Sequence, residues 1–439
     1  MSSTERRVVI TGMSVISPLG NTKDELWEAL SAGRSGVGPL TVIPSGTFPV
    51  AVAAEIPEFQ GKIDDFGPLE IEQKKAIRKG LKVMCRECQM AVAAAQGALH
   101  DAGVSPGSLD PSRTGIDFGS DYMLTLPEEF TEGILQCLGN GGQFDFSRWA
   151  LEGMPKMSPL WLLKYLPNMP ASHIAIYNDM RGPNNSLTLR EASSNAAVTE
   201  AFQTISRGRA DSMLAGATGT RLHPMKIVHV MQQEEVAPGN GDPSRASRPF
   251  DRNRTGMVLG EGAGAVILED LASAEARGAT IYAEVLGGAA RSVSDRSLVA
   301  YRGQAMRNAL AAALQNTGLV ADDVGHLNAH GLSTRTGDIE EAWAIDQVFG
   351  GRSRPLPVTA PKSYFGNLGA GGGLVELVAS VMSLRHKRLF PILNYEDPDP
   401  ECPIAGVSNG GAEPGNLFVN LNVAPQGQAS ALVVRSFEG

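Results

Sequence analysis

Cysteine is the residue type in this chain best suited to act as a nucleophile or a metal ligand, and the sequence contains four. Cys85 and Cys88 form a single CxxC motif, whereas Cys137 and Cys402 stand alone. A zinc site of this kind needs a second pair or nearby histidines. The three-residue spacing in an alanine-rich segment instead indicates two side chains that pack on one helix face. We therefore expect neither a metal nor a cofactor, and no disulfide framework.

Charged residues gather at two further places. Asp251, Arg252 and Arg254 form a polar turn just before Gly256, and paired Asp and Arg side chains of this kind commonly brace loops. A second group, on a predicted helix, consists of Lys74, Lys75, Arg78, Lys79 and Lys82. In an otherwise acidic chain such a helix is either a docking surface for an acidic partner or a solvated face, and both interpretations remain open.

Strands and helices alternate along the whole chain. The predicted strands are 7–11, 114–119, 212–216, 281–290, 326–331, 357–360, 417–421 and 430–436, and the predicted helices are 24–32, 90–102, 196–207, 304–317 and 374–384. Such alternation indicates a mainly parallel sheet with helices on both faces. We expect two comparable halves, 1–272 and 273–439. Residues 131–169, rich in glycine and then in Trp, Met and Leu, look like an insertion that contacts a partner or lines a pocket.

The bulk composition excludes several classes of protein. With 42% hydrophobic and 19% charged residues, the 439-residue chain has the composition of a soluble globular protein. A net charge of −9 argues against nucleic acid as a main partner, because phosphate binding needs a cationic surface. The apolar stretches are shorter than the roughly 20 residues needed to cross a membrane, and the first residues lack the apolar region of a signal peptide. We therefore expect a cytoplasmic protein without a membrane span.

Five segments carry a resemblance to a known family: RRVVITGMSVISPLGN, RGPNNS, SRPFDRNRTGMVLGEGAGAVILED, NAHGLSTRTGDIEE and APKSYFGN. In this order and spacing they resemble the β-ketoacyl-acyl-carrier-protein synthases of the elongating type, from residue 6 to residue 434 apart from the insertion. The resemblance implies a duplicated thiolase fold with five layers, α-β-α-β-α, and mainly parallel sheets with antiparallel edge strands. It also implies a dimer that acts on thioesters carried by an acyl carrier protein.

The family's nucleophile is a cysteine at the amino end of a buried helix, where amide dipoles lower its pKa. An ungapped alignment of residues 182–201 places Glu191 at that position. Ser193 or Ser194 would need compensating gaps, and a shift of two residues turns a helical side chain by about 200°. Because acidic side chains stabilise the start of a helix, Glu191 is alternatively a stabilising replacement after catalysis was lost.

The resemblance also locates the groups that stabilise an enolate. His330 matches the first of two basic residues, and Asn367 stands where the elongating enzymes carry the second histidine. Asparagine still donates a hydrogen bond, so an oxyanion site can survive, although His330 alone also fits a structural role. Lys362 and Glu376 match the supporting polar pair, with a buried salt bridge as the alternative.

A gate near the carboxyl end departs from the family pattern. The family has a stretch rich in glycine and phenylalanine, which supplies a backbone oxyanion donor and a gating ring. Here the matching stretch is 420–430, where Ala424 replaces the ring and Pro425 removes a backbone donor beside it. We expect a pocket that is gated differently or not at all.

Two functions follow from these residues. The first is a cysteine-less partner, similar to a chain length factor, that pairs with a cysteine-bearing ketosynthase. The second is an enzyme, active as a homodimer, in which Glu191 acts with His330 and Asn367 in acid-base chemistry or decarboxylation of an acyl or malonyl thioester. An ionised Glu191 at 5 Å from a malonyl carboxylate would repel it by about 3 kcal/mol at an effective dielectric constant of 20. That repulsion and the changed gate favour the first function, whereas the retained His330 and Lys362 favour the second.

Overall fold

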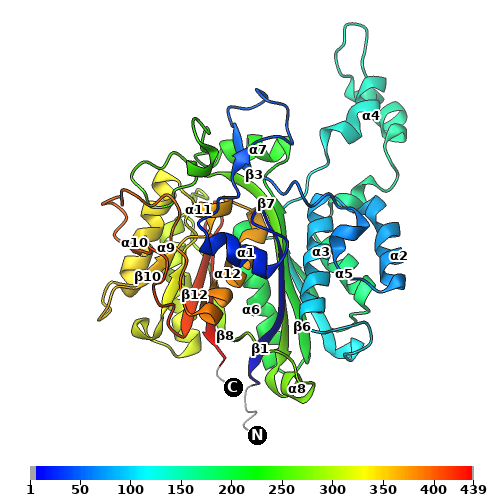
Figure 1. Cartoon of the computed structure of the whole chain (residues 1–439). Helices are drawn as coiled ribbons and strands as arrows, with labels where there is room; N and C mark the ends of the chain where they lie inside the picture. Colours follow the sequence, from blue (N-terminus) through cyan, green and yellow to red (C-terminus); the bar gives the residue numbers. More distant parts are fainter. Residues whose placement is uncertain (1–5, 438–439) are drawn as a thin grey trace.

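The computed structural model describes residues 6–437 (Figure 1). Residues 1–5, to which the expectation about a signal peptide partly applies, lie outside the described residues. The strands are β1 (Val8–Ile16), β2 (Gly38–Pro39), β3 (Val52–Ala54), β4 (Thr114–Ser120), β5 (Asn184–Leu187), β6 (Ser212–Thr220), β7 (Leu259–Asp270), β8 (Ala283–Ser292), β9 (His326–Asn328), β10 (Pro357–Thr359), β11 (Ala405–Gly406), β12 (Leu417–Val423) and β13 (Gln428–Ser436). The helices are α1 (Lys23–Ser31), α2 (Ile71–Gly80), α3 (Arg86–Asp101), α4 (Thr131–Gln136), α5 (Met169–Asn178), α6 (Ser193–Ser206), α7 (Pro224–Met231), α8 (Leu271–Ala276), α9 (Arg302–Thr317), α10 (Arg335–Phe349), α11 (Lys362–Phe365) and α12 (Gly372–His386).

One strand order occurs twice in the sheet. From β1 outward the order is β1-β7-β6-β4-β5, and from β8 outward it is β8-β13-β12-β9-β10, with the short β11 added at the end. When the short strands β2, β3 and β11 are left out of the count, the first strand of each set is followed by the fifth, the fourth, the second and the third. β1 and β8 pair with each other and join the two sets. This recurrence supports the predicted division of the chain near residue 272, which stays a prediction.

The directions of the strands differ in one respect from the expectation. We expected antiparallel strands at the edges, but the antiparallel pairs are central: β1 pairs antiparallel with β7 and β8, and β13 with β8 and β12. The outer pairs, β4 with β5 and β9 with β10, are parallel. The reason in the second set is the tight turn between β12 and β13, because a turn this short joins only antiparallel neighbours.

Helices and sheets form five layers. α3 and α5 cover one side of the first strand set, and α9 and α10 cover the far side of the second, as Figure 1 shows. Between them lie α6, which packs on β4, β6, β8 and β13, and α12, which packs on β7 and β12. The first 13 residues of α12 are buried, as an all-round apolar helix between two sheets must be. This is the α-β-α-β-α arrangement that the resemblance implied.

The segment predicted as an insertion forms an arm that projects from the body around α4 (Figure 1). After α4 it consists of short 3-10 and π turns, and it exposes apolar side chains, with Phe146 76% and Leu151 85% exposed. Trp149 and Trp161 both contact the ring of Phe130 within the arm. The two tryptophans therefore hold the arm together, and its contact with a partner stays a prediction. Among residues 6–437, no helix combines the length and the apolarity that crossing a bilayer requires.

Candidate functional site

The central helices α6 and α12 bring their amino ends to one pocket. A 3-10 turn, Arg190–Ala192, precedes α6, and a second 3-10 turn, Gly369–Gly371, precedes α12. The lining of the pocket includes Glu191, His330 and Asn367. Three residues that we predicted from the sequence are thus brought together from segments up to 176 positions apart.

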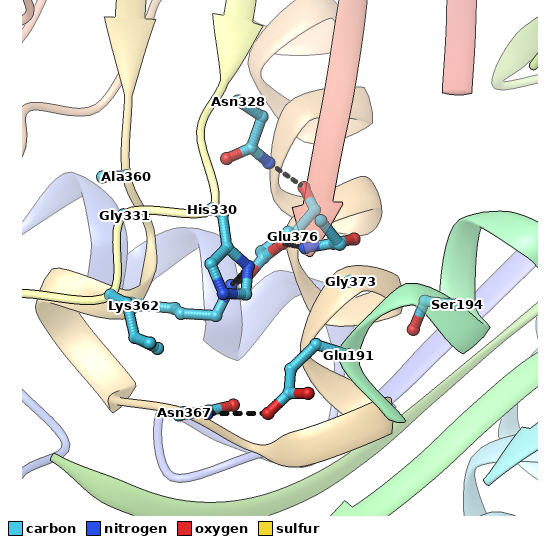
Figure 2. Close-up of polar contacts among 12 residues, drawn as sticks. Glu191, Ser194, Asn328, His330, Gly331, Ala360, Lys362, Asn367, Gly373 and Glu376 are labelled. Carbon is cyan, nitrogen blue, oxygen red and sulfur yellow. Dashed lines mark hydrogen bonds and ion pairs between the residues drawn. The ribbon is translucent and has the colours of Figure 1, made fainter. Parts of the chain in front are cut away.

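The second half of the chain contributes a network around His330. The ring follows β9 and is 3% exposed, and Nζ of Lys362 lies 3.3 Å from its Nδ1 (Figure 2). Lys362 also donates to Glu376, whose other oxygen accepts from Nδ2 of Asn422 at 2.7 Å. Burial, together with the Lys362 charge, holds the pKa of His330 well below its ordinary value. The imidazole is therefore neutral and accepts a hydrogen bond from the Lys362 ammonium.

Backbone contacts fix the loop that carries His330. The backbone N–H groups of His330 and Gly331 donate to the carboxylate of Glu341 at 2.6 and 2.8 Å. Burial raises the pKa of Glu341 to about 8, although these two N–H groups oppose the shift. The ring of His330 is thus oriented from both sides, by Glu341 behind the backbone and by Lys362 at Nδ1.

The first half contributes a cluster of charges around Glu191. Nδ2 of Asn367 donates to Oε1 of Glu191 at 3.0 Å (Figure 2). The fully buried guanidinium of Arg221 binds both Glu191 and Asp121. Burial alone raises the pKa of Glu191, but the charges of Arg221 and Arg190 and the Asn367 hydrogen bond outweigh it and hold the pKa below its usual range. Glu191 is therefore an ionised carboxylate with a buried counter-ion.

Arg190, directly before Glu191, completes the cluster. Its backbone is in the left-handed region, with φ of 53°, which is unusual for a residue other than glycine. Its Nε lies 3.8 Å from Oε2 of Glu191 and 4.0 Å from Oδ1 of Asp121, and its guanidinium lies over the ring of Tyr122 at 5.5 Å. The two arginines and two carboxylates balance, so the cluster carries no net charge.

Sequence reasoning missed three members of this cluster: Arg190, Arg221 and Asp121. A signal was present for two of them. Asp121 directly follows β4, Arg221 directly follows β6, and these strands pair in parallel with Ser120 opposite Thr218. Polar residues that follow neighbouring parallel strands meet at the same sheet edge. Arg190 carries no comparable signal, because its position depends on the conformation of the turn.

No thiol or hydroxyl replaces the carboxylate as a nucleophile in the described part of the pocket lining. Oγ of Ser193 donates to the backbone oxygen of Ser120 at 3.3 Å, and Oγ of Ser194 donates to that of Ala370. The cysteines are buried away from the pocket, and Sγ of Cys85 lies 3.6 Å from Sγ of Cys88 at the start of α3. Within residues 6–437, no three His, Cys, Asp or Glu side chains are placed to hold a metal ion.

The remaining predicted residues lie around the pocket or away from it. Asp251 accepts from the backbone N–H groups of Glu396 and Asp397 at 2.9 and 2.7 Å and braces a loop outside the pocket lining. Ala424 is buried in the turn between β12 and β13, and its N–H donates to the oxygen of Gln428 at 2.8 Å. Pro425 lines the pocket.

The basic residues of the possible docking surface lie on α2 and in the turn after it. Lys74 pairs with Asp64 and Lys75 with Glu72, each at 2.8 Å, and these side chains are largely exposed. Exposed pairs of this kind are weak, so they do not prevent the lysines from meeting an acidic partner.

Both halves of the chain are similar to known proteins. Residues 5–274 match the family model "Beta-ketoacyl synthase, N-terminal domain", and residues 282–396 match "Beta-ketoacyl synthase, C-terminal domain". The 3-oxoacyl-(acyl-carrier-protein) synthase 2 of Synechocystis sp. is 33% identical over 401 residues, which is 91% of this chain and 90% of that protein. A β-ketoacyl synthase from Burkholderia phymatum has a similar structure, with a TM-score of 0.84 and 28% identity over 99% of this chain and 100% of that one.

Two further solved structures are similar over 99% of this chain and 100% of their own. One is the ishigamide ketosynthase/chain length factor, with a TM-score of 0.81 and 27% identity. The other is a type II PKS acyl-carrier protein in complex with its ketosynthase bound to the hexaketide, with a TM-score of 0.79 and 26% identity. The predicted fold class is confirmed, and the chain belongs to the β-ketoacyl synthase family.

Proposed function

We propose that this chain is a non-condensing β-ketoacyl synthase homologue, which pairs with a cysteine-bearing ketosynthase during fatty-acid or polyketide assembly. The observation that carries the proposal is the state of Glu191. By the sequence resemblance this residue stands at the position of the nucleophilic cysteine, and it is a buried carboxylate in an ion pair with Arg221. Such a group neither attacks a thioester as a thiolate does nor accepts a proton readily.

The enolate-stabilising groups are also engaged. Nδ2 of Asn367 donates to Glu191 at 3.0 Å and contacts Sδ of Met257 at 3.4 Å, so both of its N–H bonds are in use. The N–H of Ala424, which stands where the family has its gating ring, is used within the turn between β12 and β13. An oxyanion formed in this pocket would therefore find few free donors, which supports a role outside condensation.

Relatives support the choice of partners. A chain length factor and a complex of a ketosynthase with an acyl-carrier protein are both among the similar structures. In the proposal, this chain forms a heterodimer with the ketosynthase, and the acyl chain is carried by an acyl carrier protein. A cytoplasmic location belongs to the same proposal.

Co-expression with a cysteine-bearing ketosynthase tests the proposal. We expect the two chains to co-purify as a heterodimer, and we expect the isolated chain, incubated with malonyl-carrier and acyl-carrier thioesters, to leave both unchanged in mass spectrometry. An Arg307→Ala variant, altered at an exposed position on α9, is the matched control. Turnover by the isolated chain that is lost on Glu191→Ala would overturn the proposal.

An enzyme with Glu191, His330 and Asn367 in acid-base roles is the second candidate. It is favoured by the intact network in which neutral His330 is oriented by Lys362 and Glu341. This candidate predicts turnover by the homodimer, abolished both by Glu191→Ala and by His330→Ala, whereas the first candidate predicts no turnover to abolish.

Carrier docking at α2 has a separate test. Lys75→Glu combined with Lys79→Glu reverses two charges on this helix, and we expect at least a fivefold weaker binding of an acidic carrier protein in calorimetry at low salt. Arg307→Glu, a reversal at an exposed position on α9, is the control. Equal affinities of the two variants for the carrier protein would show that the basic face of α2 is a solvated surface and not a docking site.

A further inference from the structure

Three consecutive residues after α7 reach three different elements around the pocket, and the middle one, Glu234, belongs to its lining. We name residues 233–235 the strap. Oε1 of Gln233 accepts from Arg190 at 2.7 Å, next to Glu191 in the pocket. Oε1 of Glu234 accepts from NH1 of Arg302 at 2.6 Å, and Oε2 of Glu235 accepts from the backbone N–H of Arg335 at 2.8 Å. The strap is thus tied to the turn before α6, to the first residue of α9 and to the first residue of α10.

Arg302 connects the strap to α10 as well as to α9. Its Nε donates to Oε2 of Glu340 on α10 at 2.9 Å, while its NH1 holds Glu234. Glu234, Arg302 and Glu340 all belong to the lining of the pocket that contains Glu191 and His330. The side chains become more exposed outward, from 6% for Glu234 to 16% for Arg302 and 33% for Glu340. The ion pairs therefore stand between the pocket and the surface.

We propose that Arg302 and Glu234 determine access to the pocket, so that thioesters on a pantetheine arm are excluded while Arg302 holds the strap. Separating Arg302 from Glu234 costs free energy, because a nearly buried charge without its partner is strongly disfavoured. A flexible arm that enters must separate Arg302 from Glu234 and move the strap away from α9. Water and other small neutral molecules do not need this movement. The inference goes beyond the proposed function, since it concerns entry and not chemistry.

A cysteine inside the pocket can report on access. Leu332 lines the pocket and is 7% exposed, so Leu332→Cys places a thiol behind the strap. The four natural cysteines are buried, and the unmodified protein gives their background rate. Two reagents are compared on this reporter: methyl methanethiosulfonate, which is small, and a maleimide attached to a pantetheine arm.

Arg302→Ala combined with Glu234→Ala removes both charges of the buried pair and leaves only Glu340, whose side chain is 33% exposed to water, without its partner. In the Leu332→Cys background we expect this pair to raise the rate of modification by the pantetheine maleimide at least tenfold, with a smaller rise for methyl methanethiosulfonate. Arg307→Ala in the same background should change neither rate. A rise below tenfold, or an equal rise for both reagents, overturns the proposal.

Folding is checked by circular dichroism before the rates are measured. If the double alanine variant does not fold, Arg302→Met combined with Glu234→Met replaces it, because methionine keeps much of the side-chain length and removes both charges and the hydrogen bond between them; the tenfold criterion stays the same. The assay contains neither a carrier protein nor a ketosynthase. Its failure would therefore leave the proposed partnership untouched, and failure to co-purify with a ketosynthase would leave the strap untouched.

Discussion

Glu191 and Asn367 occupy matching places in the two strand sets, yet their surroundings differ. Glu191 lies between the third strand of the first set, β5, and the central helix α6; Asn367 lies between the third strand of the second set, β10, and the central helix α12. The two side chains meet at 3.0 Å. The comparison teaches that a duplicated fold brings the amino ends of two equivalent helices to one pocket. The residue before each helix differs, a carboxylate before α6 and an amide before α12.

Each strand set, with its central helix, builds one wall of the pocket, and the two walls differ in how their buried charges are paired. In the first set, Arg221 serves two carboxylates, those of Asp121 and Glu191, and all three side chains are at most 3% exposed. In the second set, Lys362 serves Glu376 alone, and Glu376 has a further donor in Asn422. The first wall therefore places two buried carboxylates on one shared cation, with Arg190 farther away at 3.8 and 4.0 Å, whereas the second wall places one carboxylate on its cation.

The largest expected effect comes from removing Arg221, the cation that binds both carboxylates of the first wall. Arg221→Met leaves two buried carboxylates with only the more distant charge of Arg190 nearby, at 3.8 and 4.0 Å, and we expect the free energy of unfolding, measured by urea denaturation, to fall by about 5 kcal/mol. Adding Asp121→Asn and Glu191→Gln to this variant removes the unpaired charges and should restore most of the loss. A loss below about 1 kcal/mol for Arg221→Met alone would contradict the assignment of both carboxylates as ionised.

A smaller effect is expected on the other wall. Lys362→Met leaves one buried carboxylate, Glu376, which keeps its hydrogen bond from Asn422 at 2.7 Å. We expect a loss of about 3 kcal/mol in the same urea experiment. Lys387→Met, at an exposed position after α12, is the control. If Arg221→Met and Lys362→Met lose equal stability, the contrast between two carboxylates on one cation and one carboxylate on one cation is wrong.

The second strands of the two sets, β9 and β4, extend the comparison to pH. Burial lowers the pKa of His326 on β9 to about 4. The unfolded chain, with a histidine pKa near 6.5, then binds more protons than the folded one below that pH, so stability falls as the pH falls from about 6.5 to about 4. We expect a loss of about 2 kcal/mol at pH 5, and His326→Asn should remove it in urea titrations. An unchanged acid slope would show that His326 is charged in the folded protein.

Asp117 on β4 makes stability depend on pH in the opposite direction. Burial, assisted by the charge of Glu200, raises its pKa to about 8, and neither of its oxygens has a hydrogen-bond partner. Here the folded state binds the extra proton, so stability is lost as the pH rises from about 4 to about 8. Asp117→Asn should flatten this alkaline slope only in part, because Asp338 and Glu341, with pKa values raised by burial to about 7 and about 8, lose stability in the same range. An identical slope in the variant and the wild-type protein would exclude a protonated Asp117.

Much of the second wall could be predicted from the sequence, and little of the first. His330, Lys362 and Glu376 stand in motifs whose resemblance assigns them neighbouring places, and the structure brings them together. Arg221 and Asp121 stand 100 positions apart, and each looks like an ordinary polar residue after a strand. Their pairing depends on the parallel register of β4 and β6, which no local pattern specifies.

The amino-acid sequence by itself determined the alternation of strands and helices, the family, and the presence of a carboxylate before α6, because these depend on residue types and local spacing. Only the tertiary structure decided that Glu191 is ionised, that Asn367 donates a hydrogen bond to it, and that Arg302 binds Glu234 of the strap. The physical reason is that burial and the distance between charges set protonation and access. Both arise only when distant segments pack together.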